Sequence, residues 1–176
     1  MSSPAFKFLP TGAILQEFLV DNHNLVLNFS TESSYLSTHN PAHFGATIGR
    51  VANRIKNAHI SSLSGQSWTL EKNNGENSLH GGEEGWGKRK FEGPELKMVD
   101  GKEMVEFRYT SAHLEEGFPG EVEVTVGYKP TEEAGGRVRL EIELKAELKG
   151  GAEETCVNLT NHSYVGFPTL SFGCGC

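Results

Sequence analysis

Two histidines carry the acid–base chemistry that this chain can offer. His80 lies in residues 77–82, NSLHGG, and His162 lies in residues 158–164, NLTNHSY. Imidazole titrates near neutral pH, so two such groups in one cleft can catalyse proton transfers. Each also has a plain structural alternative: His80 as an exposed turn residue beside Gly-Gly, and His162 as a hydrogen-bonded core residue at a strand end. Residue types and spacing leave both alternatives open.

Glycines and arginines near these histidines point to a ligand. Gly81 and Gly82 lack a Cβ, and we expect them to permit a tight turn and to leave room beside His80 for a bulky ligand. Upstream, Arg50 and Arg54 lie in a mostly apolar stretch, and one of them is expected to point inward. A buried guanidinium needs acceptors, which the adjacent hydroxyls of a sugar can supply. The alternative is that both arginines pair with surface glutamates.

The elements that must position these residues have the periodicity of strands. Apolar and polar residues alternate over residues 105–109, 122–128 and 137–148, and less regularly over residues 24–29 and 154–159. This pattern is typical of half-buried antiparallel strands. Glycine-rich turns separate them, so the sequence predicts an all-β chain folded as an antiparallel β-sandwich. One exception is a helical spacing that allows a short helix, formed by Ile48, Val51, Ala52 and Ile55.

Composition narrows the class of protein. A chain of 176 residues favours one domain, and its net charge of −7 offers no basic face for nucleic acid. No apolar run is long enough to cross a membrane, and residues 1–7 lack the apolar stretch of a signal peptide. Three cysteines, Cys156, Cys174 and Cys176, follow no disulfide-framework spacing. We therefore expect a cytoplasmic protein, with the paired thiols near the C-terminus free and no metal bound.

Four motifs together resemble one enzyme family. They are residues 49–55 (GRVANRI), 77–82 (NSLHGG), 116–120 (EGFPG) and 158–164 (NLTNHSY). In this order they are similar to the motifs of the aldose 1-epimerases, the galactose mutarotases, and the resemblance runs from about residue 6 to residue 164. It implies the antiparallel supersandwich of that family and interconversion of the α and β anomers of hexoses such as galactose and glucose. It also implies a monomer that needs no cofactor.

The resemblance gives individual residues a role. Arg54 corresponds to the family's arginine that binds sugar hydroxyls, together with its neighbour Asn53. His80 corresponds to the histidine that binds and polarises the sugar near its ring oxygen, and His162 to the general acid. Gly81 joins the expected substrate-binding set because it flanks His80. One sugar ring must touch Arg54, His80 and His162, so these three are expected to converge on one concave surface.

The resemblance ends abruptly. In the family a glutamate base, with an aspartate that also holds the sugar, lies well downstream of the Thr-Asn-His motif, whereas residues 165–176 read VGFPTLSFGCGC. We therefore expect residues 1–164 to form the N-terminal part of an epimerase domain without its base, followed by an atypical tail. The local carboxylates that could replace the base follow His80-Gly-Gly or precede a turn, where acidic residues are ordinarily solvated: Glu83, Glu84, Glu115 and Glu116.

Two alternatives to an active epimerase remain. One is a relative that binds a hexose or a hexose 6-phosphate, for which the run Lys88-Arg89-Lys90 supplies a basic cluster, although such a run is more typical of a solvated turn. The other is a non-catalytic fragment of low stability that self-associates. Residues 137–148, as an unpaired edge or face, are the segment expected to drive that association.

Overall fold

The protein is described by a computed structural model that covers residues 5–36 and 42–166. Within them lie one short α-helix and thirteen strands, and every strand-to-strand pairing is antiparallel. The predicted all-β class is therefore confirmed. No helix in this described part of the chain is long and apolar enough to cross a membrane.

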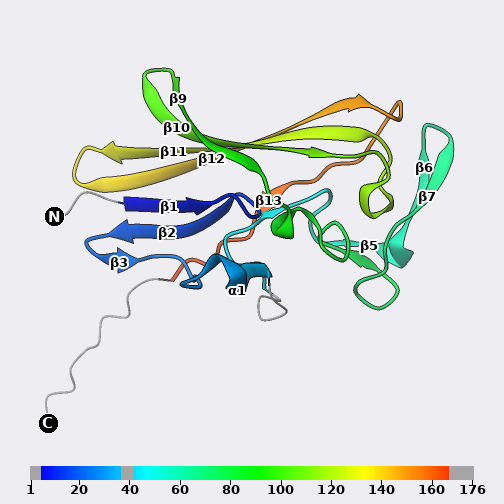
Figure 1. Cartoon of the computed structure of the whole chain (residues 1–176), viewed down its shortest axis with the longest axis horizontal. Coiled ribbons are helices and arrows are strands. Elements are labelled where there is room, and N and C mark those ends of the chain that lie inside the picture. The colour runs from blue at the N-terminus through cyan, green and yellow to red at the C-terminus, as the bar shows by residue number, and fades with distance from the viewer. Residues whose placement is uncertain (1–4, 37–41, 167–176) are drawn as a thin grey trace, which may run out of the picture.

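A long four-stranded sheet forms the upper layer in Figure 1. Its strands lie in the order β12-β11-β10-β9 and are β9 (Glu92–Val99), β10 (Lys102–Ser111), β11 (Glu121–Glu133) and β12 (Arg137–Gly150). Tight turns with positive φ link β9 to β10, at Asp100-Gly101 (52° and 74°), and β11 to β12, at Gly135-Gly136 (82° and 75°). These strands confirm the alternation predicted for residues 105–109, 122–128 and 137–148.

A three-stranded sheet lies against this layer and closes the main core (Figure 1). Its strands are β1 (Ala5–Leu9), β2 (Ile14–Val20) and β3 (His23–Asn24). Alternate residues of β11 point inward and are completely buried, from Val122 to Tyr128. The ring of Phe8 stacks on that of Tyr128 with centroids 4.5 Å apart, and the Tyr128 hydroxyl donates to the carbonyl of Ala13 at 2.6 Å. Burial of these side chains joins the two layers.

Short elements along the lower side and one end of the large sheet carry the predicted motifs (Figure 1). Three small pairings link β4 (Thr47–Ile48) to β13 (Thr160–Asn161), β5 (Arg54–Ile55) to β8 (Ser78–Leu79), and β6 (His59–Leu63) to β7 (Gln66–Thr69). The helical elements are α1 (Glu32–Leu36) and three 3₁₀-helices, Lys56–Ala58, Trp86–Lys88 and Glu115–Gly117. A second cluster of buried residues supports these elements: Ile14, Tyr35, Ala46 and Ile48. In it, the Tyr35 hydroxyl bonds both backbone groups of Phe29.

Three local expectations were wrong in detail. The helical spacing from Ile48 to Ile55 forms no helix, because Ile48 pairs with Thr160 in β13 and Val51 bridges Asn158. Residues 24–29 form no continuous strand beyond β3, and residues 154–159 form none. In all three places contacts with distant residues fix the backbone, and local periodicity does not report such contacts. The end of the atypical tail, residues 167–176, lies outside the described residues.

Candidate active site

An open pocket among these short elements contains the two motif histidines. It is lined by Ala52, Asn53, His80, Thr160, Asn161, His162, Ser163 and Tyr164, and its volume is about 520 Å³. A volume of roughly 300–1,000 Å³ is common for small-molecule sites. Strand pairing brings these residues together, because β13 pairs with β4 and the amide of His162 donates to the carbonyl of Ala46 at 2.8 Å.

The two imidazoles lie side by side although they are far apart in the sequence. The ring centroids of His80 and His162 are 5.2 Å apart and the rings meet edge to face. The amide of His80 donates to the carbonyl of Asn53 at 3.1 Å, while the Asn53 amide donates to Nδ1 of His80 at 3.1 Å. Because Nδ1 accepts, a neutral His80 carries its proton on Nε2. The side chain therefore has an N–H to offer to an oxygen atom of a ligand.

Burial makes the neutral form of His80 the favoured one. The pKa of His80 is below its usual value, because burial disfavours the charged ring. The nearby His162 and Arg54 lower this pKa further. At neutral pH the ring is consequently an uncharged hydrogen-bond donor. Such a donor suits an oxygen atom that accepts a hydrogen bond.

A third imidazole, His43, adjoins the pair, and sequence reasoning missed it. Its ring centroid lies 5.3 Å from that of His80 and 6.0 Å from that of His162. Burial, followed by the effects of His80, His162 and Lys88, lowers the pKa of His43 to about 4. His43 directly precedes the stretch that contains the two arginines, and this position was the one available signal in the sequence. Within residues 5–36 and 42–166, no group of His, Cys, Asp or Glu side chains has the arrangement of a metal site.

Asn161 fixes the backbone on which His162 stands. Its Nδ2 donates to the carbonyl of Gly45 at 2.9 Å and to the Tyr128 hydroxyl at 3.2 Å. Its Oδ1 accepts from the amide of Ser163 at 3.0 Å and from the Ser163 hydroxyl at 2.6 Å. The polar crowding around His162 is thus a set of mutual hydrogen bonds, and through Tyr128 it is tied to the large sheet.

The other expected substrate residues lie around the pocket in different ways. Asn53 lines it, whereas exposed Arg54 lies beside it, with its Nε donating to Asn74 at 2.8 Å and one terminal nitrogen to Asn53 at 3.3 Å. Gly81 is buried and is absent from the lining. A Cβ on Gly81 would come within 1.8 Å of the Gly49 carbonyl oxygen. The expectation that this glycine leaves room for a ligand was therefore wrong, since backbone fills the space.

Arg50 is the arginine that points inward, and its partners are protein groups. Its side chain is 1% exposed. The guanidinium donates to the Pro119 carbonyl at 2.7 Å and the Gly120 carbonyl at 2.8 Å, and further donors reach the hydroxyl and carbonyl of Ser111 and the carbonyl of Ala112. The expectation of an inward arginine is met, but its donors are used to join the GRVANRI and EGFPG motifs and not to meet a sugar.

None of the eight residues that line the pocket is a carboxylate. Glu115 accepts from the hydroxyls of Tyr109 (2.5 Å) and Ser111, and pairs with Arg89 at 3.0 Å. Arg89 also pairs with Glu84 at 2.7 Å and Glu116 at 3.6 Å. With its central arginine held by three carboxylates, the Lys88-Arg89-Lys90 run does not present the free basic cluster that a sugar phosphate requires.

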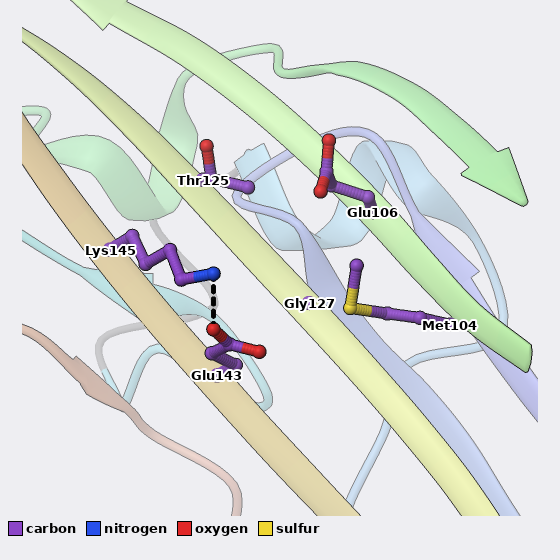
Figure 2. Close-up of a pocket in the computed structure, with 6 residues that line it drawn as sticks. All are labelled: Met104, Glu106, Thr125, Gly127, Glu143 and Lys145. Atoms are coloured by element: carbon purple, nitrogen blue, oxygen red, sulfur yellow. Dashed lines mark ion pairs between the residues drawn. The ribbon is translucent and has the colours of Figure 1, made fainter. Parts of the chain in front are cut away.

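A smaller hollow lies on the solvent-facing side of the large sheet. Figure 2 shows its lining of Met104, Glu106, Thr125, Gly127, Glu143 and Lys145. Glu143 pairs with Lys145 and with Lys129 (2.8 Å), and hydrogen bonds from both lysines lower the pKa of Glu143. Glu106 pairs with Lys97 and with Arg108 (2.7 Å). Both carboxylates are thus paired with cations, so the hollow is an ion-pair surface.

Comparison with known proteins identifies the family of this chain. The family model described as aldose 1-epimerase matches residues 4–169. The chain belongs to the aldose 1-epimerase family. It is 38% identical over 156 residues to the bifunctional protein gal10 of Schizosaccharomyces pombe, and 41% identical over 142 residues to the galactose mutarotase of Sus scrofa. These alignments cover 87% and 80% of this chain.

Solved structures of this family show the same fold. The galactose 1-epimerase from Lactobacillus acidophilus aligns with a TM-score of 0.78 at 24% identity, over 92% of this chain and 45% of that one. A GalM/aldose epimerase homologue from C. elegans aligns with a TM-score of 0.74 at 29% identity, over 94% of this chain and 52% of that one. The chain spans 21% of the S. pombe protein and 36% of the pig mutarotase. The predicted family and fold are confirmed over this span.

Proposed function

We propose that the pocket binds a hexose such as galactose or glucose, and that its histidines serve the interconversion of the α and β anomers. The observation that carries this proposal is the side-by-side placement of His80 and His162 in one open pocket, flanked by Asn53 and Asn161. Membership of the aldose 1-epimerase family supports it. The absence of a disulfide-framework spacing further supports a site of action in the cytoplasm.

The chemistry needs an acid and a base. A base removes the proton of the C1 hydroxyl while an acid protonates the ring oxygen; the C1–O5 bond then opens, the aldehyde rotates, and the ring closes on the other face. We assign the acid to His162. His80 donates through Nε2 near the ring oxygen, and Asn53 and Arg54 bind hydroxyls. No carboxylate lines this pocket. We therefore expect the base to be the glutamate that, by the family resemblance, lies downstream of the Thr-Asn-His motif and that residues 165–176 do not supply.

Polarimetry of α-D-galactose tests the activity. Three proteins are compared: the 176-residue chain, a chimera that continues after Tyr164 with the C-terminal part of the pig galactose mutarotase, and the chimera with His162→Ala. We expect fast equilibration from the chimera alone, since a positioned general acid or base contributes roughly 10²–10⁴-fold. The matched control is the chimera with His59→Ala, which changes an exposed histidine of β6 and should keep the full rate of the chimera. A chimera whose His162→Ala variant is equally fast would refute the assignment of the acid.

Binding to the 176-residue chain is tested separately, by melting with and without sugar. A ligand present at about 100 times its Kd raises the free energy of unfolding by about 2.7 kcal/mol. We expect stabilisation by galactose or glucose and none by sorbitol, which has no ring. Glucose 6-phosphate that stabilises more than glucose would favour the phosphate-binding alternative.

A further inference from the structure

The segment that carries His80 has an unusual backbone. It connects β8 to the 3₁₀-helix Trp86–Lys88 without regular structure. Four of its residues have positive φ: His80 at 54°, Gly81 at 89°, Gly82 at 119° and Gly85 at 58°. Positive φ is unfavourable for a residue with a Cβ such as histidine, so His80 keeps this conformation only while surrounding contacts hold it.

The carboxylate of Glu116 supplies contacts at the far end of this segment. One oxygen accepts from the amide of Glu83 at 3.1 Å, and the other from the amides of Glu84 at 3.2 Å and Gly85 at 3.4 Å. The Glu116 side chain is 10% exposed, and a Cβ on Gly82 would lie 2.4 Å from one of its oxygens. Three successive amides therefore converge on one carboxylate, an arrangement that stabilises a negative charge.

Asn73 holds the near end of the same segment. Its Oδ1 accepts from the amide of Leu79 at 2.7 Å, and its Nδ2 donates to the carbonyls of Leu79 at 2.8 Å and Gly82 at 2.5 Å. Together, the side chains of Asn73 and Glu116 bracket His80. Neither side chain lines the pocket that contains His80 and His162, so both contact the segment outside that pocket.

We propose that Glu116 is a positioning residue, whose carboxylate binds the amides of residues 83–85 and thereby fixes the direction of the His80 imidazole. Its charge is compensated by Arg89, whose guanidinium lies 3.6 Å away. Both oxygens are occupied by amides, which is why Glu116 is unsuited to replace the base at C1. The orientation of His80 is a property of the chain without a ligand. Only the effect of that orientation on sugar binding rests on the proposed function.

The test compares Glu116→Ala and Glu116→Gln with Glu103→Gln, which removes an exposed carboxylate from the large sheet. Two readouts need no sugar: amide hydrogen exchange at residues 83–85 and the NMR resonances of the His80 imidazole. We expect Glu116→Ala to speed exchange at these three amides by about tenfold or more and to shift the His80 resonances. Glu116→Gln keeps one accepting oxygen and should restore both readouts in part, and Glu103→Gln should leave both unchanged.

A titration with galactose, followed in the same spectra, adds the functional readout. The wild-type chain should bind more tightly than Glu116→Ala, by about tenfold. Unchanged exchange at residues 83–85, or faster exchange with unmoved His80 resonances, overturns the proposal. If the wild type does not bind galactose, the proposed function fails, and the two sugar-free readouts still decide the role of Glu116. If Glu116→Ala does not fold, Glu116→Gln against Glu103→Gln gives the same decision.

Discussion

The protonation of His43 links the pocket to stability. Its pKa of about 4 in the folded protein lies below the usual 6.5. Between these values the unfolded chain binds more protons than the folded one, so the free energy of unfolding should fall as pH falls from about 6.5 to about 4. Urea unfolding at several pH values measures the slope. His43→Asn should reduce it, and His59→Asn, at an exposed position, should not. Equal slopes for the wild type and His43→Asn would contradict the prediction.

Arg50 offers a second residue-scale prediction. Arg50→Lys keeps the positive charge but cannot reach the carbonyls on both sides, near Ser111 and near Pro119. A buried acceptor left without its partner costs about 1–3 kcal/mol, so the free energy of unfolding should drop by about 3 kcal/mol or more. Arg54→Lys, at an exposed position, should change it by less than about 0.5 kcal/mol. Denaturant unfolding measures both, and similar losses would contradict the prediction.

The arginines also show what the sequence can and cannot indicate at this scale. An apolar neighbourhood correctly predicts that one guanidinium turns inward. The sequence does not indicate which arginine turns inward or which acceptors it meets. These depend on carbonyls of residues 111–120, which come close to Arg50 only in the folded chain. His43 was missed for the same reason, because its proximity to His80 is a property of the assembled pocket.

At the scale of elements, two glycines that both have positive φ should respond very differently to a side chain. Gly75 (φ 62°) has open space around its missing Cβ, whereas Gly81 (φ 89°) faces the carbonyl of Gly49. Gly75→Ala should cost about 1 kcal/mol, the usual strain of positive φ. Gly81→Ala must also displace a backbone and should cost about 3 kcal/mol or more. Thermal melting distinguishes the two, and comparable shifts would be evidence against this packing.

The elements also show where periodicity is a sufficient guide. The strands β10, β11 and β12 were predicted from long alternating runs, because on each of them one face is more buried than the other over much of the strand. The two-residue strands β4, β5, β8 and β13 were not predicted. They contain too few residues to show a period, and their pairing partners lie far away in the sequence. The motifs that resembled a known family marked this region where periodicity did not.

At the scale of the whole molecule, β12 is an edge strand of the large sheet in the described part of the chain. Its inward row, which includes Leu140, Ile142 and Leu144, is half-buried. We expect the purified 176-residue chain to self-associate through this strand, as an exposed edge with apolar side chains favours. Sedimentation velocity over a range of concentrations measures this. A monomer at all concentrations would contradict the prediction.

Two neighbouring substitutions test the same strand. Leu140→Lys places a charge in the inward row and should weaken association by about tenfold, or 1.4 kcal/mol. Glu141→Lys places the same side chain on the solvent-facing row and should have a much smaller effect, because Glu141 is exposed. If both variants weaken association equally, then net charge controls self-association, and the prediction that the apolar edge controls it is contradicted.

Three of the four tyrosines make the molecule an optical reporter of its own unfolding. Burial raises the pKa of Tyr35, Tyr109 and Tyr128, which lie in different parts of the core. Above about pH 10 the unfolded chain releases these protons and the folded chain keeps them, so stability should fall as pH rises. After a jump to alkaline pH, the phenolate absorbance of these three rings should grow at the rate at which the core opens. Tyr128→Phe should remove about a third of this slow increase. If the absorbance instead reached its final value immediately after the jump, the rings would be accessible to solvent in the folded chain and the prediction would be contradicted.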